Sequence, residues 1–180
     1  MVPAVALILA AAFGGADQYL GSFSAHPWMA DVSLLSAPWL AIAFLAGTTQ
    51  TSPRRGAALG FACTAAALAG YAVMTLSPVE NAHYSVAGFM GWARSSDLVL
   101  IGALVTGPLF GWFGQQWRVR RARLGAVVTA LAICLEPLAR VPAHREIRSG
   151  TVELVEEAIG LLAVGYASLA ARRSRTVETR

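Results

Sequence analysis

The sequence predicts an all-α membrane protein, a polytopic bundle of six transmembrane helices with both termini in the cytoplasm. Only 13% of the 180 residues are charged and 56% are apolar, whereas soluble domains carry about 25% charged residues. The apolar residues gather in runs that suit helices of about 20 residues, the length that crosses a ~30 Å hydrocarbon layer. Arginines stand at the ends of these runs. We therefore expect a multi-pass protein of the cell membrane, surrounded by membrane lipid.

Six runs are expected to form the spanning helices: 2–20, 32–48, 56–76, 97–117, 124–140 and 151–171. The second is the weakest because Pro38 lies within it. It can begin as a short surface helix after "HPWMAD" and enter the bilayer at Ser36, a suitable N-cap. Residues 1–171 then form a single membrane domain, and 172–180 form a basic cytoplasmic tail.

Two later segments have features of their own. Gly107 and Pro108 are expected to kink the fourth run, and its glycines at 107, 111 and 114 favour close helix packing. The loop from Pro78 to Ser96 is long for a connector. Its "SVAGFMGW" either lies on the surface or folds in as a lid.

The arginines orient the runs. Three groups follow the second, fourth and sixth runs: Arg54 and Arg55; Arg118, Arg120, Arg121 and Arg123; Arg172, Arg173, Arg175 and Arg180. If six helices alternate in direction, these groups share one side of the membrane, which the positive-inside rule makes cytoplasmic. Every acidic residue except Glu178 then lies in the outer half or in an outer loop.

Several function classes are excluded. The chain has no lysine, so a side-chain Schiff base cannot form, and no ATP-binding phosphate loop occurs. The arginines do not form a stripe for nucleic acid. Cys63 and Cys134 lie inside apolar runs without metal spacing. His26, His83 and His144 lie on three outer loops but lack a fixed ligand spacing, so we predict no metal site and no cofactor.

Three carboxylates are candidate site residues, because an acid at membrane depth usually faces the bundle interior and has a partner. Asp17 lies near the outer end of the first run, on a stripe with small residues, and is either inward-facing or an interfacial cap. Glu136 precedes Pro137, which is expected to kink the helix, and broken backbone at membrane depth either lines a cavity or packs on protein; the alternative is a pair with Arg140. Glu157 is expected to face inward.

Other residues complete the candidate site or compete with it. Glu153 shares the face of Glu157 and is expected at a solvated helix end, whereas Glu156 points elsewhere. Gln18 would supply a hydrogen bond, and Tyr71 and Trp92 would stack on a ligand. An interfacial aromatic belt is the alternative explanation for the aromatic residues.

Four segments, "GGADQYLGS", "SLLSAPWLAIAFLAG", "GYAVMTLSPVE" and "GPLFGWFG", resemble an actinobacterial family of integral membrane proteins that carries only a domain-of-unknown-function label. The resemblance covers about Gly14 to Pro142 and implies no activity. The size, six helices and internal termini are also similar to the substrate-binding subunits of energy-coupling-factor transporters. That likeness implies a ligand near the outer surface and a membrane partner subunit docked on "AAAFGGA" of the first helix.

Three functions are open. The first is a transport or substrate-binding subunit that captures a small polar or cationic molecule near the outer face, using Asp17, Gln18, Tyr71, Trp92, Glu136 and Glu157. The second is an intramembrane enzyme on a lipid-soluble substrate, such as an isoprenoid (terpene) cyclase, in which Asp17, Glu136 or Glu157 donates a proton. An accessory subunit without a ligand is the third. An aqueous mouth would favour binding, and a dry cavity open to lipid would favour the enzyme.

Overall fold

The computed structural model describes residues 2–23, 26–120, 123–140 and 150–178 and is all-α, with 87% helix and no strand among the residues it describes. The order of elements is α1 (Val2–Gly21), α2 (Pro27–Ser33), α3 (Ala37–Thr48), α4 (Pro53–Thr75), a 3-10 turn η1 (Pro78–Glu80), α5 (Val86–Ser95), α6 (Asp97–Arg120), α7 (Arg123–Arg140) and α8 (Gly150–Glu178). α6 continues through Pro108. α8 continues through most of the residues expected to form the basic tail.

Among the residues that the structure describes, three helices are long and apolar enough to cross a membrane: Val2–Gly21, Pro53–Thr75 and Asp97–Val119. At most 33% of each apolar window is buried inside the protein. Large side chains such as Ile8, Leu9 and Leu98 are therefore exposed, at 68%, 64% and 80%. An apolar surface this extensive is unfavourable in water but is the expected surface in lipid. The protein thus has the helices and the surface of a membrane protein.

The second predicted run is divided into two helices, as its Pro38 and Ser36 suggested. α2 ends at Ser33, and α3 begins at Ala37 with Ser36 as its N-cap. α3 is an apolar helix of 12 residues, which at 1.5 Å per residue is about 18 Å long and too short to cross the hydrocarbon layer alone. Because α2 ends at Ser33 and α3 begins at Ala37, the helical backbone is interrupted between them.

Glycines let α4 pack closely between α1 and α6. A Cβ on Gly14 of α1 would lie 1.8 Å from the carbonyl oxygen of Ala67, and one on Gly111 of α6 would lie 2.4 Å from that of Gly56. Only glycine permits such approach of two helix backbones. The expected tight packing of the fourth run is confirmed, and the small face of α1 at Gly14 is covered by α4.

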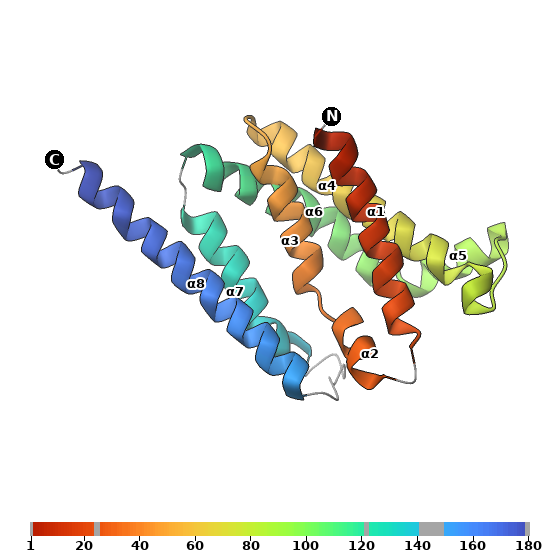
Figure 1. Ribbon diagram of the computed structural model, residues 1–180. Coiled ribbons are helices and arrows are strands. Elements are labelled where there is room, and N and C mark those ends of the chain that lie inside the picture. Colours follow the sequence, from red (N-terminus) through yellow and green to blue (C-terminus); the bar gives the residue numbers. More distant parts are fainter. Residues whose placement is uncertain (1, 24–25, 121–122, 141–149, 179–180) are drawn as a thin grey trace.

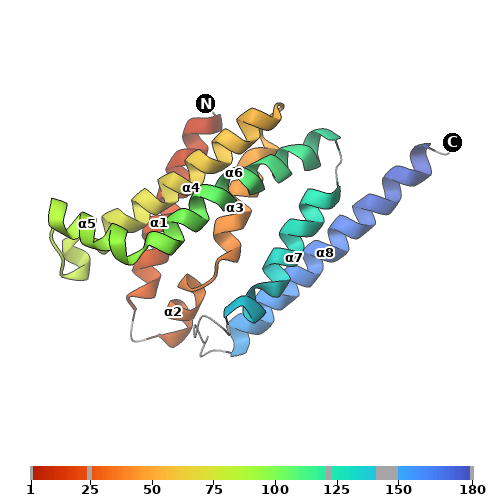
Figure 2. The same ribbon diagram turned by 180° about the vertical axis from the view of Figure 1, so that it is seen from behind.

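The helices form two groups (Figure 1): α7 contacts α6 near its own start, where a Cβ on Gly125 would lie 2.9 Å from Phe113, and contacts α3 near its own end through Glu136. α7 and α8 pair side by side, and they diverge from α3 toward the top of the view, as the reverse view also shows (Figure 2). The start of α1, the α3–α4 connection and the ends of α6 and α8 all lie toward that top end. α5 lies at the right-hand edge of Figure 1, beside the end of α4 and the start of α6.

α5 is a surface helix. Its N-cap Ser85 accepts a hydrogen bond from the backbone N–H of Gly88 at 3.0 Å. None of its residues is buried. Of the two alternatives for "SVAGFMGW", the structure therefore shows the surface one.

Candidate functional site

Asp17 is a buried carboxylate near the end of α1. It is 6% exposed, and the indole of Trp39 donates a hydrogen bond to it. Asp17 lies four residues before the end of α1, and Trp39 lies two residues after the start of α3. The two helices run in opposite directions, so these positions fall at the same depth. Of the two interpretations left open by the sequence, the inward-facing one matches this geometry.

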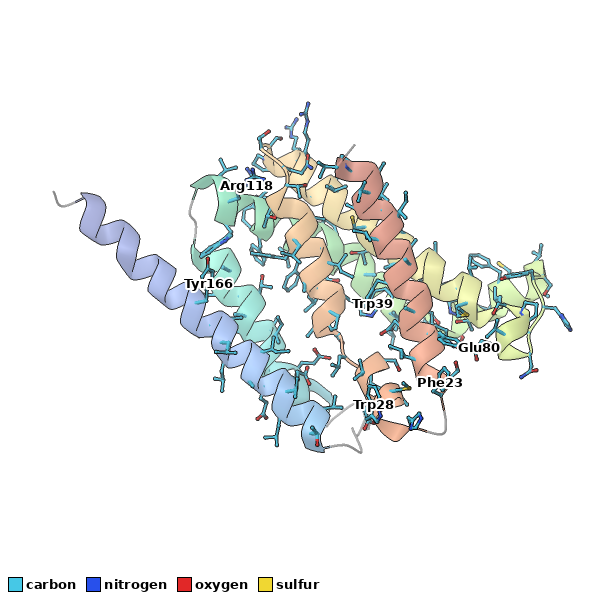
Figure 3. All side chains as sticks on the ribbon, in the orientation of Figure 1. Phe23, Trp28, Trp39, Glu80, Arg118 and Tyr166 are labelled. Carbon is cyan, nitrogen blue, oxygen red and sulfur yellow. The ribbon has the colours of Figure 1, made fainter. Side chains whose placement is uncertain are left out.

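Aromatic rings from three helices surround this hydrogen bond. The Trp39 ring lies 5.5 Å from that of Phe13 on α1, edge to face at 76°, and 6.2 Å from that of Tyr71 on α4. Figure 3 shows Trp39 between α3 and α1. We call Phe13, Asp17, Trp39 and Tyr71 the acid–aromatic cluster. Carboxylate oxygens and ring faces are the groups that attract a cation.

The sequence pointed to Asp17 and Tyr71 but not to Trp39. One signal existed: Trp39 stands one turn after the expected entry point of the second run at Ser36. An indole there lies at the depth of Asp17 once α1 and α3 are placed antiparallel. Chain proximity alone could not show that α1 and α3 are neighbours.

Glu136 of α7 caps the N-terminus of α3. Its two carboxylate oxygens accept hydrogen bonds from the backbone N–H groups of Ser36 and Ala37, the latter at 2.7 Å. Glu136 is 7% exposed. The positive end of the helix dipole and two charge-assisted hydrogen bonds stabilise a carboxylate in this position.

The first turn of α3 has only two backbone N–H groups that need an acceptor from outside the helix, so one carboxylate can satisfy both. Pro38 has no N–H, and the N–H groups of Trp39 and Leu40 donate to the carbonyl of Ser36 at 3.1 and 3.2 Å. Only the N–H groups of Ser36 and Ala37 are left for Glu136. A break in buried backbone needs internal hydrogen-bond partners, and Glu136 supplies them. The alternative partner Arg140 has its side chain outside the described residues.

The inward face of α8 differs from the expected one. Glu156 is 3% exposed, whereas Glu157 is exposed, so the expectation that Glu157 faces inward is wrong. The cause is Gly160, one turn after Glu156, where a Cβ would lie 2.6 Å from the sulfur of Cys134 on α7. This contact sets the rotation of α8. The side chain of Glu153 lies outside the described residues.

Asp31 is a further buried acid, at 3% exposure on α2. Both Asp31 and Glu156 have interaction partners, and α2 contacts α8. The sequence placed Asp31 outside the second run and Glu156 away from the inward face of the sixth run, because neither acid lies at the expected inward position of a run. Their burial depends on how α2 and α8 meet.

Gln18 and Trp92 lie differently with respect to the cluster. Gln18 follows Asp17 and is half-buried. Trp92 lies on the peripheral helix α5, where its ring is 5.7 Å from that of Phe89, and α5 packs against α6. The structure thus keeps Trp92 away from Asp17.

No group of three or more metal-ligating residues occurs in the part of the chain that the structure describes. His26 and His83 are exposed, and His144 lies outside the described residues. Cys63 and Cys134 are free; Cys63 is a buried core residue, and Cys134 is half-buried.

A separate apolar groove of about 230 Å³ lies between α3 and the α7–α8 pair, and its described lining contains no carboxylate.

Comparison of the chain with protein-family models, curated proteins and solved structures gives no match.

Proposed function

We propose that the protein is a multi-pass membrane subunit that binds a small polar or cationic molecule through the acid–aromatic cluster at the outer end of the bundle. The observation that carries this proposal is the buried carboxylate of Asp17 among the rings of Phe13, Trp39 and Tyr71. A desolvated cation beside a carboxylate and an aromatic face gains about 2 kcal/mol or more from the ring alone. Gln18 supplies a hydrogen bond beside Asp17.

Glu136 has a positioning role in this proposal. Both of its oxygens already accept backbone N–H groups at the start of α3, so it holds the turn that presents Trp39 to Asp17. Glu157 is exposed and Trp92 is remote, so neither belongs to the proposed site.

The proposed topology has six crossings with both termini in the cytoplasm. α1, α4 and α6 are long and apolar enough to cross, and in this proposal the α2–α3 pair, α7 and α8 supply the other three crossings. Labelling intact cells with a membrane-impermeant maleimide tests this, in a background where Cys63 and Cys134 are replaced. We expect His83→Cys to be labelled and Arg54→Cys to be protected. The opposite pattern would refute the orientation.

A partner subunit on α1 is compatible with the structure only on part of that helix. The Gly14 face is covered by α4. A partner would therefore meet the exposed face that carries Ile8, Leu9, Ala12 and Ala16.

Ligand binding is tested with the purified full-length protein by thermal unfolding in the presence of organic amines, vitamins and divalent ions. A ligand of the proposed site should raise the unfolding temperature of the wild type and of Glu157→Gln, but not of Asp17→Asn. Glu157→Gln is the matched control because it neutralises an exposed acid. Equal stabilisation of Asp17→Asn, or no stabilisation of the wild type, would overturn the proposal.

The intramembrane enzyme is the second candidate, because a buried acid beside aromatic rings also suits protonation of an alkene and stabilisation of the resulting carbocation. Asp17 would donate the proton. The apolar groove does not support this function, since its described lining has no carboxylate. Consumption of an isoprenoid by the wild type but not by Asp17→Asn would favour the enzyme.

A further inference from the structure

The groove between α3 and the α7–α8 pair is lined on both sides by mostly apolar side chains. Its lining comprises Ala41, Phe44 and Leu45 of α3, Trp117 of α6, Ala126, Thr129, Ala130 and Ile133 of α7, and Ala163 and Tyr166 of α8. The α7 residues follow the spacing i, i+3, i+4, i+7, which places them on one helical face. Small side chains on facing helices leave room between them. At about 230 Å³, the groove is smaller than a typical small-molecule pocket of about 300–1,000 Å³, and a narrow apolar chain suits it.

The position of Glu136 explains why the groove exists. Glu136 joins α7 to the start of α3, whereas the α7–α8 pair diverges from α3 toward the opposite end (Figures 1 and 2). There the rings of Trp117 and Tyr166 meet at 6.5 Å. Trp and Tyr side chains favour the level of lipid headgroups.

A cationic side chain lies at the same end of α6 as Trp117. Arg118 follows Trp117, is exposed, and donates one hydrogen bond from Nη1 to the carbonyl of Thr48 at 2.8 Å. Figure 3 shows Arg118 at the end of α6, beside the α3–α4 connection. A guanidinium has five N–H donors, so Arg118 retains donors for a phosphate group.

The sequence makes this end of the groove basic. The segments 32–79 and 98–135, which contain α3, α4, most of α6 and the first part of α7, include no acidic residue. They include Arg54, Arg55 and the arginines at 118, 120, 121 and 123. Basic pockets between helices at the cytoplasmic side are the sites that bind anionic lipid headgroups.

We propose that an anionic phospholipid binds this groove, with an acyl chain between α3 and α7 and its phosphate on Arg118. This inference goes beyond the proposed function, since the acid–aromatic cluster is not involved. The occupant is a lipid because the lining is apolar, the aromatic pair lies at one end, and the exposed side chain at that end of α6, Arg118, is cationic.

Native mass spectrometry of the purified full-length protein tests the proposal by titration with phosphatidylglycerol and phosphatidylcholine of the same acyl chains. We expect phosphatidylglycerol to bind about fivefold more tightly, the gain expected from one arginine near an anionic lipid surface. Arg118→Gln should remove this preference and Arg118→Lys should keep most of it. Arg94→Gln, an exposed arginine on α5, is the matched control.

A second variant tests the acyl site. Ala41→Phe fills the groove and should weaken both lipids, whereas Ala69→Phe on the exposed face of α4 should weaken neither. Equal binding of the two lipids by the wild type would overturn the proposal, as would full binding by Ala41→Phe. Displacement of phosphatidylglycerol by millimolar inorganic phosphate would likewise overturn it, because the headgroup alone would then account for binding. Each readout measures lipid binding away from the acid–aromatic cluster, so failure of this test leaves the Asp17 experiment unaffected.

Discussion

Glu136 is expected to be among the residues that contribute most to stability, because its carboxylate satisfies the backbone break between α2 and α3. Glu136→Gln leaves one carbonyl oxygen and places an NH₂ donor against an N–H donor, so one of the two hydrogen bonds is lost. A hydrogen bond to a charged group contributes about 1.5–3 kcal/mol. With about 2–4 °C per kcal/mol for a protein of this size, the variant should unfold about 3–12 °C lower. Glu136→Ala loses both bonds and should unfold lower still.

The thiol of Cys63 provides the assay. Cys63 is 0% exposed in the core between α1 and α4, so a fluorogenic maleimide reacts with it only after unfolding. Cys134→Ala removes the second thiol from the background. Heating the detergent-solubilised protein with the dye then reports the unfolding temperature.

Glu157→Gln is the control for this experiment, because it changes an exposed acid in the same way. It should unfold at the temperature of the parent protein. If Glu136→Gln and Glu136→Ala unfold at the same temperature as Glu157→Gln, the carboxylate does not stabilise the start of α3. The hydrogen bonds from Glu136 to the backbone N–H groups between α2 and α3 would then contribute nothing to stability.

Three further predictions use the same assay. Gly111→Ala should destabilise by about 1–3 kcal/mol through overpacking, because its Cβ would lie 2.4 Å from a carbonyl oxygen of α4; Gly102→Ala, with nothing within 4 Å, should be neutral or stabilising, and equal effects would refute the close-packing argument. Asn81 has φ 56°, so Asn81→Gly should be tolerated and Asn81→Val should cost about 1–2 kcal/mol; a neutral Asn81→Val would contradict this. Gln115 is 1% exposed and donates to the carbonyl of Thr51 at 3.1 Å; Gln115→Ala should leave that carbonyl without its side-chain donor and lower the unfolding temperature by several degrees, and an unchanged temperature would argue against this contact.

The acid–aromatic cluster was only partly predictable. Asp17 could be identified because a carboxylate in an apolar helix is energetically costly, and this feature is visible in the sequence of that helix alone. Trp39 could not, since its role depends on α1 and α3 being neighbours. Glu136 was identified as unusual from its position before Pro137, but its partner Ala37 is 99 residues away, and no local pattern connects the two.

The sequence by itself determined the helical class, the membrane-compatible surface and the end of the bundle that carries the arginines. Composition and run length act on each segment separately, so no knowledge of neighbours is needed. Only the tertiary structure decided which acid each helix buries. The rotation of a helix about its axis depends on contacts such as that of Gly160 with Cys134. A rotation by one residue position decides whether Glu156 or Glu157 is the buried acid.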